Sequence, residues 1–61
     1  MGEIVIRANK EKVVELPEGM DFEPSRETAK YLKLDHLKGN KWKCKNTNSK
    51  APITIRFESK I

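Results

Sequence analysis

The chain has 61 residues, enough for one domain, and its 36% apolar residues allow a small core but not a deep enclosed pocket. A single cysteine, Cys44, excludes an intramolecular disulfide, and no apolar run approaches the about 20 residues that a membrane helix needs. We therefore expect one domain over residues 1–61, located in the cytoplasm and without a signal peptide or membrane segment.

Two β-branched segments near the N-terminus predict two strands that form a hairpin. Residues 3–8 contain isoleucine and valine, and residues 12–16 contain two valines and a leucine after a short turn. Pro17 cannot donate a ladder hydrogen bond and Gly19 can adopt a positive φ, so the second strand is expected to end there. Residues 20–24 are expected to connect this hairpin to the next element.

The following segment has the start and stop signals of a helix. Ser25 is a suitable N-cap, because its hydroxyl can accept a hydrogen bond from an unpaired amide of the first turn. Ala29, Leu32 and His36 would share one helical face, and the glycine–asparagine pair that follows is typical of a helix C-terminus. Residues 31–34 also alternate between apolar and polar, so a strand there is the alternative.

The second half of the chain contains the two clearest strand patterns. In residues 41–46, Trp42 and Cys44 alternate with lysines, so these two side chains would face one side and the lysines the other. Residues 47–52 are turn formers, and residues 53–58 alternate again, with three apolar side chains pointing inward.

These elements predict an α+β domain with the order β-β-α-β-β. One helix would pack on one face of a four-stranded sheet that is antiparallel or mixed. We expect Trp42 and Phe57 to belong to the core rather than to a ligand site. The expected core consists of Ile4, Ile6, Val13 or Val14, Leu16, Phe22, Ala29, Leu32, Trp42, Cys44, Ile53, Ile55 and Phe57.

The opening of the chain, a hairpin ending in Val14-Glu15-Leu16-Pro17-Glu18-Gly19 and followed by a helix, resembles the start of small β-grasp domains, including the sulfur-carrier proteins. The resemblance covers about the first half of the chain and implies a β-grasp arrangement there. Sulfur carriers act through a C-terminal diglycine, whereas this chain ends in Ser59-Lys60-Ile61. Sulfur transfer is therefore not expected, and we assign the chain to no family.

The residue types that bind metals or perform catalysis are too sparse to predict a reaction. One histidine, His36, and one cysteine, Cys44, are fewer than the about three or four ligands of a zinc site. Cys44 is expected on the inner strand face, where a thiol is unreactive. The acidic residues between 15 and 27 match no calcium loop, and no glycine-rich phosphate loop is present. We expect no enzymatic activity, no metal, no cofactor and no small-molecule substrate.

Charge is divided unevenly along the chain. Residues 1–29 carry four basic and seven acidic side chains, a net charge of −3, whereas residues 30–61 carry nine basic and two acidic ones, a net charge of +7. A basic segment of this kind indicates an anionic partner, so the second half is the main functional indication in the sequence.

A row of lysines is the best candidate binding site. On one strand face they would stand about 6.6–6.8 Å apart, an arrangement suited to phosphates rather than to base reading. An arginine from a neighbouring strand and a lysine from the loop would complete the patch. The candidate nucleic-acid-binding residues are Lys41, Lys43, Lys45, Lys50 and Arg56. The alternative is that the lysines protect an edge strand from aggregation. An exposed Trp42 beside them would favour nucleic acid, because bases stack on aromatic side chains.

We therefore expect a non-enzymatic binding module that associates with nucleic acid through its basic C-terminal half. The alternative is a protein-interaction module, a small adaptor or inhibitor that binds another protein or forms a homodimer through a sheet edge or through its opposed charges. Composition and spacing leave these two classes open.

Overall fold

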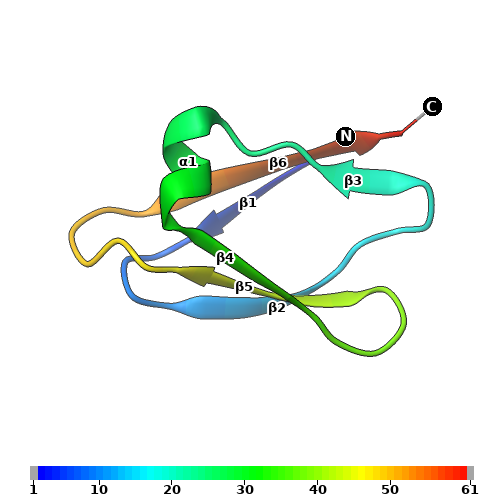
Figure 1. The fold of residues 1–61 in the computed structure, drawn as a ribbon, viewed down its shortest axis with the longest axis horizontal. Helices are drawn as coiled ribbons and strands as arrows, with labels where there is room; N and C mark the ends of the chain where they lie inside the picture. The colour runs from blue at the N-terminus through cyan, green and yellow to red at the C-terminus, as the bar shows by residue number, and fades with distance from the viewer. Residues whose placement is uncertain (1, 61) are drawn as a thin grey trace.

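The chain folds into two small β-sheets and one short helix. The structure is a computed structural model that describes residues 2–60. Its elements in chain order are β1 (Gly2–Ile6), β2 (Glu11–Glu15), β3 (Met20–Phe22), α1 (Arg26–Tyr31), β4 (Leu32–His36), β5 (Lys41–Asn46) and β6 (Ile53–Ser59) (Figure 1). Two antiparallel three-stranded sheets have the orders β1-β6-β3 and β2-β5-β4. The predicted α+β domain, with one four-stranded sheet and a helix packed on its face, is therefore wrong.

The first two strands do not form the predicted hairpin. β1 pairs with β6, where Ile4 lies opposite Ile55, and β2 pairs with β5, where Val14 lies opposite Trp42. Between β1 and β2 the chain turns at Asn9, whose φ is 59°, and passes from one sheet to the other. Within residues 2–60, β4 and β5 are the only consecutive strands that pair. The resemblance to β-grasp domains depended on the first hairpin, and this topology does not support it.

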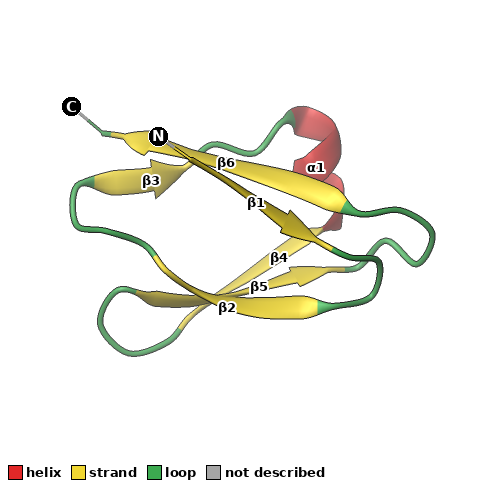
Figure 2. Cartoon of the chain, turned by 180° about the vertical axis from the view of Figure 1, so that it is seen from behind, coloured by secondary structure: helices red, strands yellow, loops and turns green. Residues whose placement is uncertain are grey.

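The two sheets face each other, and their inner faces enclose the core (Figures 1 and 2). The core consists of buried Ile6, Cys44, Ile53 and Ile55, with Ile4, Val14, Phe22, Leu32, Leu34 and Trp42 partly buried against them. Leu16 is also buried, as predicted, whereas Phe57, which was predicted in the core, is half-buried and lies outside this cluster. Alternation in the sequence predicted most of these positions correctly, and between the two candidate valines it is Val14 that points inward while Val13 is 61% exposed. Ala29 was predicted in the core and is exposed, and Asn46 was not predicted and is fully buried.

The helix is shorter than its cap signals predicted. The predicted N-cap is confirmed, because the Ser25 hydroxyl oxygen accepts a hydrogen bond from the Thr28 amide at 3.2 Å. The helix ends at Tyr31, and Leu32 already has extended backbone angles. As a strand, this segment turns both Leu32 and Leu34 toward the core, whereas a helix would turn them to different faces. The alternative of a strand in residues 31–34 was therefore the better interpretation.

A three-residue strand was missed in the segment that was predicted to be a connection. Met20–Phe22 forms β3, which pairs with the end of β6 and places Phe22 opposite Phe57. The Phe22 ring then meets the Trp42 ring edge-on, with centroids 5.8 Å apart, and so joins the two sheets. Three residues are too few for a periodic pattern to be recognised in the sequence.

Candidate functional site

The predicted lysine row lies on β5, with the orientation that alternation indicated. Lys41, Lys43 and Lys45 point away from the core, while Trp42 and Cys44 lie on the inner side. β5 is the central strand of its sheet, between β2 and β4. The alternative that these lysines protect a sheet edge is therefore wrong, because β5 has no free edge.

Acidic side chains on the neighbouring strands flank the lysine row. Each lysine of the row lies opposite one carboxylate: Lys41 faces Glu15, Lys43 faces Asp35 and Lys45 faces Glu11. An ion pair also crosses diagonally from the Lys43 Nζ to a Glu11 carboxylate oxygen at 3.9 Å. Opposite charges on facing strands stabilise a sheet, so these carboxylates offset part of the positive charge of Lys41 and Lys43.

Lys45 differs from the other two members of the row, because its second neighbour is also basic. On β4 it lies opposite Lys33, and both side chains are exposed. Like charges placed directly opposite each other destabilise a sheet. A negatively charged ligand over this pair would remove the repulsion.

Arg56 does not join the lysine row. It lies on β6, which pairs with β1 and β3 rather than with β5. It alternates with the buried Ile55, so it faces outward from the opposite sheet, where its guanidinium lies 3.6 Å from a Glu58 carboxylate oxygen. The expectation that Arg56 comes from a neighbouring strand of the same sheet is therefore wrong, because the sequence does not reveal which strands pair.

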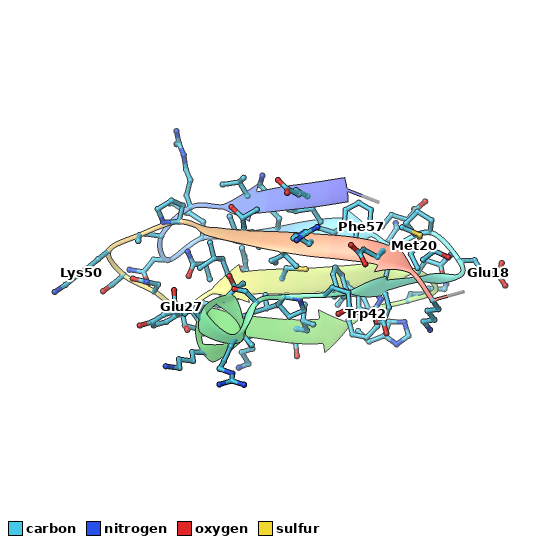
Figure 3. All side chains as sticks on the ribbon, turned by 90° about the horizontal axis from the view of Figure 1, so that it is seen from above. Glu18, Met20, Glu27, Trp42, Lys50 and Phe57 are labelled. Atoms are coloured by element: carbon cyan, nitrogen blue, oxygen red, sulfur yellow. The ribbon has the colours of Figure 1, made fainter. Side chains whose placement is uncertain are left out.

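Two of the predicted site residues, Lys45 near the end of β5 and Lys50 in the β5–β6 loop, belong to the end of the molecule where this loop lies near the β1–β2 turn (Figure 1). Four basic residues of the neighbouring segments were not predicted as ligands. We call this surface the basic end. Its members are Arg7, Lys10, Lys30, Lys33, Lys45 and Lys50, all exposed. Figure 3 shows Lys50 and Glu18 at opposite ends of the long axis, which measures 33 Å. Acidic residues also lie there: Glu11 is opposite Lys45 on β2, and Figure 3 places Glu27 toward the same end as Lys50.

Backbone hydrogen bonds bring the segments of the basic end together. The Asn9 amide in the β1–β2 turn donates to the Asn48 carbonyl in the β5–β6 loop at 3.0 Å. The Thr47 amide donates to the Tyr31 carbonyl at the end of α1 at 2.8 Å, and the Thr47 hydroxyl donates to the same oxygen at 2.9 Å. The Asn46 amide donates to the Lys10 carbonyl at 2.9 Å. Segments 7–10, 30–33 and 45–50 are therefore held side by side.

Asn46 is the buried support of this end. Its side-chain amide nitrogen donates to the carbonyl oxygens of Ile6, Arg7 and Ala51, at 3.1, 3.2 and 2.9 Å. Its side-chain oxygen accepts from the Asn48 amide at 2.8 Å. Because a buried polar side chain needs such partners, Asn46 fixes the relative position of the β1 end and the β5–β6 loop. No sequence pattern marked it, since asparagine at a strand end is usually part of an exposed turn.

The opposite end has no comparable excess of positive charge. The β2–β3 and β4–β5 loops meet there through a hydrogen bond from the Leu16 amide to the Asn40 carbonyl, 2.8 Å long. This end carries Lys38, Lys41 and Lys60, together with Glu15, Glu18 and Asp21. The molecule is therefore most strongly basic at the end that carries Lys50.

Trp42 is not a stacking platform for a ligand at the basic end. Its half-buried ring packs against the core and against the His36 ring, with centroids 4.5 Å apart and an interplanar angle of 18°. The His36 Nε2 donates to the Gly39 carbonyl at 2.7 Å. The exposed Trp42 that would have favoured nucleic acid is thus not found. The aromatic residue at the basic end is instead Tyr31, which is 40% exposed.

Cys44 is fully buried between the sheets, and this burial raises the pKa of its thiol. Its register partner on β4 is Leu34, and the histidine, His36, stacks on Trp42 instead.

Within residues 2–60, no three or more His, Cys, Asp or Glu side chains gather in a way that could hold a metal ion. The described part of the chain also has no helix with the length and apolar character needed to cross a bilayer.

Comparison of the chain with protein-family models, with curated proteins and with solved structures found no match.

Proposed function

We propose that the chain is a nucleic-acid-binding module that holds phosphates through its basic end. One observation carries this proposal: six exposed bases come from segments 7–10, 30–33 and 45–50, which backbone hydrogen bonds hold side by side. Lysine presents a compact positive charge on a flexible stem, which suits phosphates along a backbone more than it suits a specific base edge. Binding of this kind is independent of sequence and depends steeply on salt, because each neutralised phosphate releases counterions.

The facing pair Lys33 and Lys45 supports this proposal over a purely structural role for the basic residues. Lys45 lies opposite the carboxylate of Glu11 on one side, as Lys41 and Lys43 lie opposite carboxylates, but on its other side it faces a second lysine. Two lysines placed opposite each other cost stability in the free protein. This cost is offset when a phosphate lies between them.

The free sheet edges favour this function over self-association. The four edge strands β1, β2, β3 and β4 carry the charged residues Glu3, Lys12, Asp21 and Lys33 respectively. Charged residues on edge strands discourage pairing with another chain. Protein binding through a sheet edge is therefore the second candidate function. A molecular mass on size-exclusion chromatography that stays at the monomer value over a wide range of protein concentration would argue against a homodimer.

The proposal is tested by neutralising two bases at each end of the molecule. Lys45→Gln with Lys50→Gln removes two charges from the basic end, and Lys38→Gln with Lys60→Gln removes the same net charge from the other end. Binding to a short dye-labelled single strand is followed by fluorescence anisotropy at several salt concentrations. We expect the first pair to lower the slope of log affinity against log salt by about 1.4, at about 0.7 per lost contact.

The control pair, Lys38→Gln with Lys60→Gln, should leave this slope close to that of the unchanged protein. Equal losses for both variants would mean that only the net charge matters, and the basic end would not be a binding site. Absence of binding by the unchanged protein at low salt would overturn the proposal altogether.

A further inference from the structure

The basic end borders an open groove that the lysines do not line. The groove has a volume of about 440 Å³ and lies between α1, the β5–β6 loop and β6. Pockets for small ligands span about 300–1,000 Å³, so a single nucleobase with part of its sugar is of suitable size. Its lining residues include Tyr31, the hydroxyl-bearing Ser25 and Thr28, and the apolar Pro52 and Ile53.

Tyr31 is held at the rim of this groove while its side chain stays accessible. Its carbonyl oxygen accepts two hydrogen bonds from Thr47, which fix the backbone, and the residue is 40% exposed. No hydrogen bond to its phenol oxygen occurs among residues 2–60. An exposed aromatic ring on a fixed backbone is the arrangement on which nucleic-acid bases stack.

Arg56, which does not belong to the lysine row, is one of the residues that line this groove. Although it faces away from β5, it lines the same groove as Tyr31, and its side chain is 61% exposed. A guanidinium on the groove wall can stack on a base or contact a phosphate beside it. Arg56 and the lysines of the basic end would then contact one ligand from two sides.

The charges around the groove determine which part of a nucleotide enters it. Glu27 lines the groove and would repel a phosphate there, whereas Lys30 and Lys50 lie beside it on α1 and on the β5–β6 loop. The phosphates are therefore expected to follow the lysines while the base enters the groove. A base can do this only when it is unpaired, because the bases of a duplex are stacked inside it.

We propose, on the basis of the phosphate-binding function above, that the ligand is single-stranded nucleic acid and that one unpaired base stacks on Tyr31 in this groove. The probes for the test are dye-labelled oligonucleotides of about ten nucleotides, a length within the range of known single-strand sites. Four are compared: single-stranded DNA, single-stranded RNA, a DNA duplex, and a DNA strand whose nucleotides are abasic. The variants are Tyr31→Ala and Tyr31→Phe.

The unchanged protein should bind the intact single strands about tenfold more tightly than the abasic strand, since stacking of one base has about this effect. Tyr31→Ala should lose this advantage on intact strands and bind the abasic strand and the duplex as before, while Tyr31→Phe should retain it. Circular dichroism of both variants checks that the fold persists.

Two outcomes separate this inference from the function on which it rests. If the abasic strand and the duplex bind as tightly as the intact single strands, and Tyr31→Ala has no effect, phosphate binding stands and base stacking is refuted. If none of the four probes binds at low salt, both proposals fail.

Discussion

Asn46 places a fully buried amide at the point where the β1 end and the β5–β6 loop meet. Replacing it with alanine leaves the carbonyls of Ile6, Arg7 and Ala51 without this donor. Unpaired buried polar groups cost about 1–3 kcal/mol each, so we expect Asn46→Ala to lower the free energy of unfolding by about 2–4 kcal/mol. Urea denaturation measures the change.

Asn48→Ala is the matched control for this residue. The Asn48 side-chain oxygen accepts from the Lys50 and Ala51 amides, but it lies closer to solvent, so water can replace it. We expect a loss of about 1 kcal/mol or less. An equally large loss from both substitutions would contradict the special role of the buried amide.

Cys44 makes stability depend on pH in the alkaline range. Burial raises the pKa of its thiol above the ordinary value of 9.0, so the unfolded chain loses this proton at a lower pH than the folded one. Below that ordinary value the thiol is protonated in both states and stability is unaffected. Above it, the folded state binds more protons, and the free energy of unfolding falls by at most about 1.4 kcal/mol per pH unit.

The measurement for Cys44 is urea denaturation at about pH 8 and about pH 10, on both sides of the ordinary thiol pKa. Cys44→Ala removes this titration, so its loss of stability between the two pH values should be smaller than that of the unchanged protein. An identical loss in both proteins would show that the alkaline effect comes from other groups.

At the scale of elements, local signals competed in the segment that holds α1 and β4. Ser25 does cap a helix, and Gly39 does take a positive φ of 65°, but in the turn between β4 and β5 rather than at a helix end. The helix stops after six residues because an extended backbone brings both Leu32 and Leu34 to the core. In a chain with so few apolar residues, burying both outweighed the intrinsic preference for helix.

The pairing of β4 with β5 predicts a conflict between stability and binding at Lys33. In Lys33→Glu the new carboxylate lies opposite Lys45, so repulsion across the strands becomes attraction. We expect the free energy of unfolding to rise by about 0.5 kcal/mol at low salt, a modest amount because both side chains are exposed. Affinity for nucleic acid should fall in the same variant.

Denaturation and anisotropy titrations on Lys33→Glu, each at low and high salt, measure the two effects. Lys33→Gln is the intermediate control, which removes the repulsion without adding attraction. A variant that is more stable and binds as tightly as the unchanged protein would exclude Lys33 from the binding surface.

At the scale of the whole molecule, charges that are dispersed in the sequence are gathered by the fold. The net charge of the second half predicted a basic surface, yet its strongest concentration also needs Arg7 and Lys10 from the acidic first half. The lysine row on β5, in contrast, is offset by acids from β2 and β4. Trp42 lies away from Lys50 in Figure 3, so its fluorescence reports on the core rather than on the basic end.

The sequence by itself determined the features that depend on neighbouring residues along the chain. Alternation in residues 41–46 and 53–58 identified two strands and the faces they bury, because side chains of an extended backbone alternate between two sides. The Ser25 cap and the outward direction of the β5 lysines followed from equally local rules.

Only the tertiary structure decided which strands pair and which charges meet. β1 pairs with β6 across nearly the whole chain, and Asn46 contacts Ile6 over a separation of 40 residues. Such contacts depend on how the two sheets bury a small shared core. Short patterns in the sequence do not predict which distant segments pair in this way. The same packing placed Arg56 in the lining of the groove that Tyr31 also lines, and it brought the segments that carry the six bases to one end.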